Sequence, residues 1–157
     1  MDKILDIDNV DLKIISLLNK DAKTPYTEIA KKVFVSSGTV HVRMRKLEDL
    51  GVVKSATLNI DFSKLGYDIS AFLGIYLEKS SLYDTVIVKL KDISEVINAY
   101  YTTGNYSIFA KIICKDTDHL REVLNKIQLV EGIDRTETLI VLEESINRPI
   151  HLVIDKK

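Results

Sequence analysis

Basic and hydroxyl side chains gather in one stretch of this sequence, residues 31–54. The stretch holds six Lys and Arg residues against two Asp and Glu residues, although the whole chain of 157 residues has a net charge of −1. Lysine and arginine neutralise phosphates, and arginine can also bind a guanine edge through two hydrogen bonds. Hydroxyl groups such as those of Ser36 and Ser37 can reach phosphate oxygens or bases. These residue types predict contact with double-stranded DNA.

Three helices are predicted to position this stretch. The first is expected over Asp8–Asn19, with Asp8 as its N-terminal cap. The second should start after Thr24, its expected cap, and Pro25, whose fixed φ suits the first position of a helix. Apolar residues recur at i, i+3, i+4 and i+7 in the second helix, so it should pack against its neighbours along one face.

The third predicted helix begins at Ser36 or Ser37 and ends before Gly51. At 100° per residue, it has an apolar face formed by Val40, Met44, Leu47 and Leu50. The opposite face is basic and polar. A tight turn precedes this helix and a strand is expected from Val52, which together are typical of a winged helix-turn-helix.

The outward face of the third helix suggests specific roles. Arg45 is expected to bind guanine, His41 to hydrogen-bond a base, and Val42 to contact a thymine methyl group. Arg43 lies beside the apolar face and either contacts a phosphate or forms an internal ion pair. Lys54 should touch the DNA backbone from the wing. The candidate DNA-binding residues are Ser36, Ser37, Gly38, Thr39, His41, Val42, Arg43, Arg45, Lys46 and Lys54.

The second half of the chain alternates strand and helix patterns. Strands are expected over 68–77, 95–102, 106–114 and 133–143, and helices over 81–91 and 116–129. The order β-α-β-β-α-β over about 80 residues predicts a ferredoxin-like domain. Two helices would cover one face of the sheet, and a second copy of the chain is the simplest cover for the other face.

These patterns predict an α+β protein in three parts. Residues 1–55 are expected to form the winged helix-turn-helix, 56–66 a linker strand, and 67–157 the ferredoxin-like domain for effector binding and oligomerisation. Charge follows this division, because residues 1–66 carry 11 basic against 9 acidic residues and 67–157 carry 11 against 14. The positive charge therefore lies on the side of the predicted DNA contact.

Composition argues for a cytoplasmic protein without disulfides. No apolar run is long enough to cross a bilayer, and the start MDKILDID lacks the features of a secretion signal. Cys114 is the single cysteine, which forbids an intrachain disulfide and fits a reducing compartment. Its place in a strand pattern predicts core packing.

An enzyme is the main alternative from another functional class. His41, His119 and His151 have no spacing typical of metal ligands, and we expect His119 to lie at the surface. The sequence has neither a glycine-rich phosphate loop nor a nucleophile elbow. We therefore expect no catalytic residues, no metal and no cofactor.

The two halves together resemble the Lrp/AsnC (feast/famine) family of transcription regulators over nearly the whole chain. The stretches that carry the resemblance are IDNVDLKIISLLNKDAKTPYTEIAKKV, VSSGTVHVRMRKLEDLGVV, KLGYDISAFLGIYL, AYYTTGNYSIFAKIIC and TETLIVL. The resemblance implies a DNA-binding regulator that dimerises through its sheets and commonly forms octamers. It also implies an amino-acid effector bound near contacts between dimers. The last two stretches are similar to the asparagine-responsive member, so asparagine is the favoured effector.

Carried onto this chain, the resemblance places the effector site on a loop and a facing strand. Backbone N–H groups around Gly104 and threonine hydroxyls suit a carboxylate, and Asp134 or Glu137 suits an ammonium group. Asn105 or a threonine could pair with a side-chain amide. From the residues alone, an ordinary hairpin turn is the favoured interpretation of this loop, and the family resemblance reverses that preference. The implied effector-binding residues are Tyr100, Tyr101, Thr102, Thr103, Gly104, Asn105, Tyr106, Leu124, Ile133, Asp134, Arg135, Thr136, Glu137 and Thr138.

The chain departs from the family pattern at three positions. Phe34 stands in the helix-turn-helix turn where the family usually has glycine, and Ser37 where it often has proline. Asn105 replaces a histidine of the asparagine-responsive member, which bears on the identity of the ligand. An alternative function within the same fold is a DNA-organising protein of broad specificity with little or no effector response.

Overall fold

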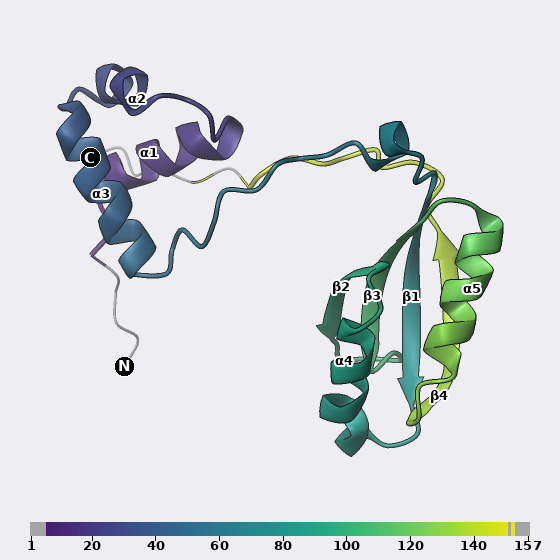
Figure 1. Ribbon diagram of the computed structural model, residues 1–157. Helices are drawn as coiled ribbons and strands as arrows, with labels where there is room; N and C mark the ends of the chain where they lie inside the picture. Colours follow the sequence, from purple (N-terminus) through teal and green to yellow (C-terminus); the bar gives the residue numbers. More distant parts are fainter. Residues whose placement is uncertain (1–5, 151, 153–157) are drawn as a thin grey trace. The chain divides into compact units, whose positions relative to one another are not determined.

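The computed structural model describes residues 6–150 and residue 152 (Figure 1). Its contacts divide the chain into two compact units. The N-terminal unit comprises the described residues of Met1–Leu58 and Ile146–Lys157, and the C-terminal unit comprises Asn59–Ser145. Within the described residues, no helix is both long and apolar enough to span a bilayer.

Three helices build the N-terminal unit, as the sequence predicted. They are α1 (Asn9–Lys20), α2 (Tyr26–Val33) and α3 (Ser37–Asp49). Each helix contributes apolar side chains to one core, because each has its apolar residues on a single face. The buried members of this core are Ile14, Ile29, Ala30, Val33, Val40, Met44 and Leu47.

The start of α1 confirms the predicted cap. The carboxylate of Asp8 accepts hydrogen bonds from the N–H groups of Val10, at 2.8 Å, and Asp11, at 2.9 Å. The carboxylate of Asp11 in turn accepts from the N–H of Asp8, at 3.1 Å. This reciprocal pair is a capping box, which satisfies N–H groups that the helix leaves without partners.

The start of α2 differs from the prediction. Pro25, not Thr24, occupies the cap position, and its carbonyl accepts from the N–H groups of Glu28 and Ile29. Pro25 has φ −62° and ψ 141°, so it is extended and lies just outside the helix. The hydroxyl of Thr24 therefore lies too early to cap α2, and it donates to the carbonyl of Asp21 at 2.8 Å.

The turn between α2 and α3 places Phe34 in a left-handed conformation. Its φ is 59° and its ψ is 46°, and it is the one non-glycine residue with positive φ in the described chain. Its side chain is 92% exposed. A left-handed conformation brings Cβ close to a carbonyl oxygen, so only glycine adopts it without cost. The departure from glycine noted above therefore falls on a strained position.

We expect Phe34→Gly to raise the free energy of unfolding of the N-terminal unit by about 0.5–1 kcal/mol, because it removes this strain. The exposed ring contributes little packing that could be lost. Urea unfolding followed by circular dichroism would measure the change. Phe34→Ala is the matched control, because it removes the ring but keeps Cβ, and it should give no gain. A gain from alanine as large as that from glycine would contradict the strain argument.

The segment after α3 corrects two expectations. Gly51 ends the helix with φ 70°, as predicted, but the described residues 52–61 form no strand, so neither the wing strand nor the linker strand is present in this chain. Instead, Phe62–Leu65 forms the short 3-10 helix η1, capped by the carboxylate of Asp61. Alternating apolar residues favour a strand only where another strand lies beside them to share hydrogen bonds.

The C-terminal unit has the predicted ferredoxin-like order. Its elements are β1 (Ile69–Leu77), η2 (Ser80–Leu82), α4 (Tyr83–Lys91), β2 (Val96–Tyr101), β3 (Ile108–Cys114), α5 (Thr117–Gln128) and β4 (Ile133–Ile140). The four strands form one antiparallel sheet in the order β2-β3-β1-β4. Both helices cover the same face of this sheet (Figure 1). The α+β fold class is confirmed.

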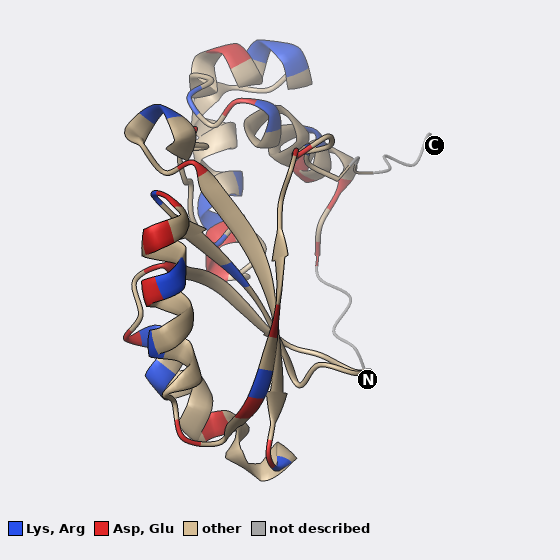
Figure 2. Cartoon of the chain, turned by 90° about the vertical axis from the view of Figure 1, so that its right-hand side faces the viewer, with Lys and Arg blue, Asp and Glu red and all other residues tan. Residues whose placement is uncertain are grey.

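The two faces of the sheet differ in composition. On the helix-covered face, alternate residues of β1 and β3, such as Leu73 and Ile112, are fully buried against α4 and α5. The opposite face, which we call the open face, carries aromatic side chains, including Phe72 and Phe109 with ring centroids 5.4 Å apart. Figure 2 shows that most of the sheet ribbon is uncharged, whereas charged positions concentrate on the helices.

The ring of His119 is not at the surface as expected. Its side chain is 20% exposed, its Nδ1 accepts from the N–H of Lys115 at 3.1 Å, and its Nε2 lies 3.0 Å from a carboxylate oxygen of Glu95. Because Nδ1 accepts a hydrogen bond, Nε2 carries the proton and donates to Glu95. This pair links the start of α5 to the start of β2. Cys114 is buried in the core, as predicted.

Candidate DNA-binding helix and effector surface

Local hydrogen bonds fix where α3 begins. The hydroxyl of Ser36 accepts from the N–H of Thr39 at 3.0 Å, and the two hydroxyl groups lie 2.8 Å apart. Ser36 is therefore the cap, and Ser37 is the first helical residue. The N-terminal end of α3, where the helix dipole is positive, is exposed together with Ser37 and Gly38. This arrangement suits contact with an anion.

The outward face of α3 carries the side chains that the helical spacing predicted. His41, Val42 and Arg45 are exposed, with Val42 at 68%. Arg45 has no hydrogen bond or ion pair with any residue that the structure describes. Leu50 is less buried than expected, at 39% exposed, because it is the C-terminal cap rather than part of the helix. Arg45 is therefore the one arginine of α3 that has no partner among the described residues, and it lies on the face predicted to contact bases.

Arg43 forms the internal ion pair, one of its two predicted alternatives. One guanidinium nitrogen lies 2.7 Å from Asp8 and 2.8 Å from Asp11. Asp11 is completely buried, and its hydrogen bond to Arg43 raises the pKa of the guanidinium. A buried carboxylate requires such a partner, because an unpaired charge in the core is costly. Arg43 therefore ties α3 to the capping box of α1.

Lys46 is paired too, although more loosely. Its ammonium lies 3.0 Å from Asp6 and 3.7 Å from Asp11. The hydrogen bond to Asp6 raises the pKa of Lys46. A cleft of about 660 Å³ beside these groups is lined by Asp6, Asp8, Ser36, Gly38, Thr39, Val42, Arg43 and Lys46. Six of the lining residues are candidate DNA-binding residues: Ser36, Gly38, Thr39, Val42, Arg43 and Lys46. Lys54 is exposed elsewhere.

The candidate effector loop is a hairpin between β2 and β3. Gly104 has φ 102°, a conformation that favours glycine, and nothing lies near the position that a Cβ would take. The loop is closed by the hydroxyl of Thr102, which donates to the carbonyl of Tyr106 at 2.8 Å. The backbone around Gly104 is exposed and accessible to a ligand.

A carboxylate and two phenols connect this loop to β4. Glu137 accepts hydrogen bonds from the hydroxyls of Tyr106, at 2.8 Å, and Tyr76, at 3.0 Å, and the bond from Tyr106 lowers the pKa of Glu137. The guanidinium of Arg135 lies 4.0 Å from the centre of the Tyr76 ring. A Cβ at Gly74 would lie only 2.4 Å from the ring of Tyr106, so the absence of a side chain there allows this arrangement.

Sequence reasoning missed Tyr76 and Gly74. A glycine inside a strand is a signal for close approach, and the alternation of β1 places both residues on the face of Phe72. This signal points to the Glu137 cluster only when the strand register is known. The register between β1 and β4 pairs Gly74 with Glu137 and Tyr76 with Arg135.

The candidate effector residues lie on both faces of the sheet. By register, Tyr100, Arg135 and Glu137 belong to the open face, whereas Tyr101, Thr136 and Thr138 belong to the helix-covered face. Leu124 packs partly buried on the helix-covered side, while Asp134 is exposed. The described residues of one chain therefore do not bring the whole set to one point. The remaining loop residues, Thr103 and Asn105, are exposed, and Ile133 packs against the core.

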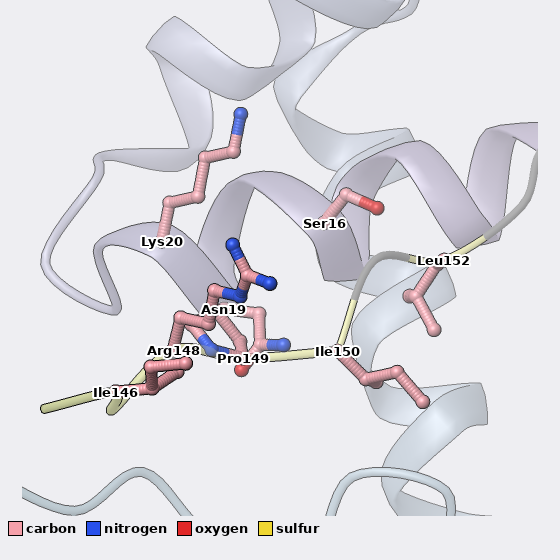
Figure 3. A pocket seen from close by; sticks show the side chains of 8 residues that line it. All are labelled: Ser16, Asn19, Lys20, Ile146, Arg148, Pro149, Ile150 and Leu152. Atoms are coloured by element: carbon pink, nitrogen blue, oxygen red, sulfur yellow. The ribbon is translucent and has the colours of Figure 1, made fainter.

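A larger cleft of about 860 Å³ lies within the N-terminal unit, between α1 and the C-terminal segment (Figure 3). Figure 3 shows Lys20 and Arg148 near one end of it and Ile150 and Leu152 near the other. No sequence pattern pointed to this grouping, because the segment after β4 has no regular periodicity. His151 lies outside the described residues.

A helix-turn-helix with an exposed basic helix, joined to a ferredoxin-like unit with an accessible loop, defines the class of ligand-responsive DNA-binding regulators. Residues 7–54 match the winged helix-turn-helix DNA-binding domain. Residues 70–150 match the Lrp/AsnC ligand binding domain. The chain therefore belongs to the Lrp/AsnC family and is a DNA-binding transcription regulator similar to AsnC.

Individual relatives agree with this assignment. The regulatory protein AsnC of Haemophilus influenzae is 49% identical over 145 residues, which cover 92% of this chain and 97% of the relative. AsnC of Escherichia coli K12 is 46% identical, covering 92% and 95%. A solved structure of E. coli AsnC has a TM-score of 0.86 at 45% identity and covers 92% of this chain and 97% of that one. Both sequence relatives are named as regulatory proteins.

Proposed function

We propose that this protein is a sequence-specific transcription regulator that inserts α3 into the major groove. The observation that supports this role most directly is the exposed, unpaired Arg45 beside Val42 and His41 on the outward face of a helix whose other face is buried. In a dimer, two copies of α3 would bind half-sites about one helical turn, or a multiple of it, apart. The sequence division into a DNA-binding part (1–55), a linker (56–66) and an effector part (67–157) belongs to the same proposal, except that the described residues from Ile146 onward group with the N-terminal unit. A cytoplasmic location, where the DNA is, is also part of this proposal.

The internal pairing of Arg43 argues against the DNA-organising alternative. A protein that binds broadly through phosphates needs free cations, and Arg43 is held by the carboxylates of Asp8 and Asp11. The ratio of affinities for a selected operator and for random DNA at one salt concentration decides between the two functions.

The effector in this proposal is a small amino acid, with asparagine favoured by the family resemblance. Free N–H groups near Gly104 suit its carboxylate, and Asp134 suits its ammonium group, because Glu137 is already occupied by two phenols. Since the candidate residues lie on both faces of one sheet, a second subunit would complete the pocket. An effector bound between subunits stabilises one assembly, such as an octamer, to the extent that it binds that assembly more tightly.

Calorimetry with a panel of asparagine, leucine, lysine and glutamine should show one clear binder, with asparagine expected. Gly104→Val should abolish its heat of binding, because a β-branched residue is strained at φ 102° and reshapes the loop. Gly66→Val is the matched control, since Gly66 also has positive φ and open space around it but lies outside the loop. It should keep the binding heat. Absence of heat with every amino acid would refute the effector proposal and leave the DNA-binding proposal in place.

A further inference from the structure

Asp6 has an unusual position for an acidic residue. Its side chain is 95% exposed, yet its carboxylate lies 3.0 Å from the ammonium of Lys46 on α3. It also lines the cleft formed by Ser36, Gly38 and Val42. An acidic group therefore stands at the surface that we propose for DNA, where a phosphate would carry the same charge.

The neighbouring acidic residues have structural roles that Asp6 lacks. Asp8 caps α1 and pairs with Arg43, and Asp11 completes the capping box from a fully buried position. Asp6 lies before the helix, and among the described residues its carboxylate forms a hydrogen bond only with Lys46. Its removal should leave the fold unchanged.

We propose that Asp6 competes with DNA phosphate for Lys46 and thereby lowers the affinity of each protomer for DNA. This inference rests on the proposed role of α3. The carboxylate is an intramolecular anion that occupies the ammonium while DNA is absent. A phosphate that approaches Lys46 must displace Asp6, and the displaced carboxylate then remains close to the negatively charged backbone.

The size of the effect follows from the exposure of the pair. Exposed ion pairs are weak, so release of Lys46 should strengthen binding by about two- to fivefold for each protomer. The effect multiplies when two protomers bind one site. Because phosphate contacts carry no sequence information, operator and random DNA should gain by the same factor.

Fluorescence anisotropy with the full-length protein provides the test. Two duplexes are used: one selected from a random pool by the wild-type protein and one of scrambled sequence. Asp6→Asn should tighten binding to both duplexes by the same factor, and the salt dependence should steepen by about one released ion per protomer. Lys46→Gln should weaken binding to both, and adding Asp6→Asn to it should have no further effect.

Asp49→Asn is the control for charge alone, because Asp49 is an exposed aspartate at the other end of α3. It should change affinity less than Asp6→Asn does. A gain that persists without Lys46, a gain matched by Asp49→Asn, or weaker binding by Asp6→Asn would each overturn the inference. If Arg45→Ala reduces operator binding while Asp6→Asn has no effect, the inference fails alone. If Arg45→Ala also has no effect, the proposed role of α3 fails with it.

Discussion

Arg43→Ala is expected to lower the free energy of unfolding of the N-terminal unit by roughly 2–3 kcal/mol. The substitution leaves Asp11, which is completely buried, with only the ammonium of Lys46 at 3.7 Å as a counter-charge. It also removes the partner of the Asp8 cap, so the start of α1 loses support. Urea unfolding followed by circular dichroism measures the loss.

Arg45→Ala serves as the matched control for this experiment. Arg45 lies two residues from Arg43 on the same helix, but it is exposed and has no partner in the described part of the chain. Its removal should change stability by less than about 0.5 kcal/mol, as for an ordinary surface position. Equal stability of the two variants would show that the Arg43 ion pairs contribute nothing to folding.

Arg45→Ala should have its large effect on DNA. If Arg45 binds guanine through two hydrogen bonds, its loss should cost roughly 1–3 kcal/mol on the selected operator, which is about a tenfold to hundredfold weaker affinity. The scrambled duplex should lose much less, since it offers no matched base. Titrations of both duplexes at one salt concentration measure the difference.

Arg121→Ala is a suitable comparison for lost charge. Arg121 is exposed on α5, and the structure gives its side chain one ion pair, with Asp118. Its removal takes the same charge from the chain but should leave both affinities unchanged. An equal loss of affinity for both duplexes in Arg45→Ala would reassign Arg45 to a phosphate contact.

Features set by local sequence were predicted well. The cap at Asp8 follows from a side chain that bonds within its own turn, and the buried face of α3 follows from helical spacing. The order of strands and helices in the C-terminal unit likewise follows from short-range periodicity. Each of these interactions is complete within a few residues, so the sequence contains all that is needed to predict it.

Features that depend on distant partners were harder to predict. The surface position expected for His119 was wrong because Glu95, 24 residues earlier, receives its hydrogen bond. The wing strand expected from Val52 was wrong because a strand needs a neighbour. The roles of Gly74 and Tyr76 at the open face required the register between β1 and β4, which alternation within one strand does not specify.

The described residues of Ile146–Lys157 group with those of Met1–Leu58, which gives the described chain the architecture of an inserted domain. Along the sequence, the ligand-sensing unit lies between the two segments of the unit that carries α3. An affinity tag or fluorescent fusion at the C-terminus therefore follows a segment whose described residues belong to the DNA-contacting unit, despite their distance in sequence. Tagged preparations used for operator titrations should have the tag removed, and an excised sensor fragment is better bounded by Asn59 and Ser145 than by the chain terminus.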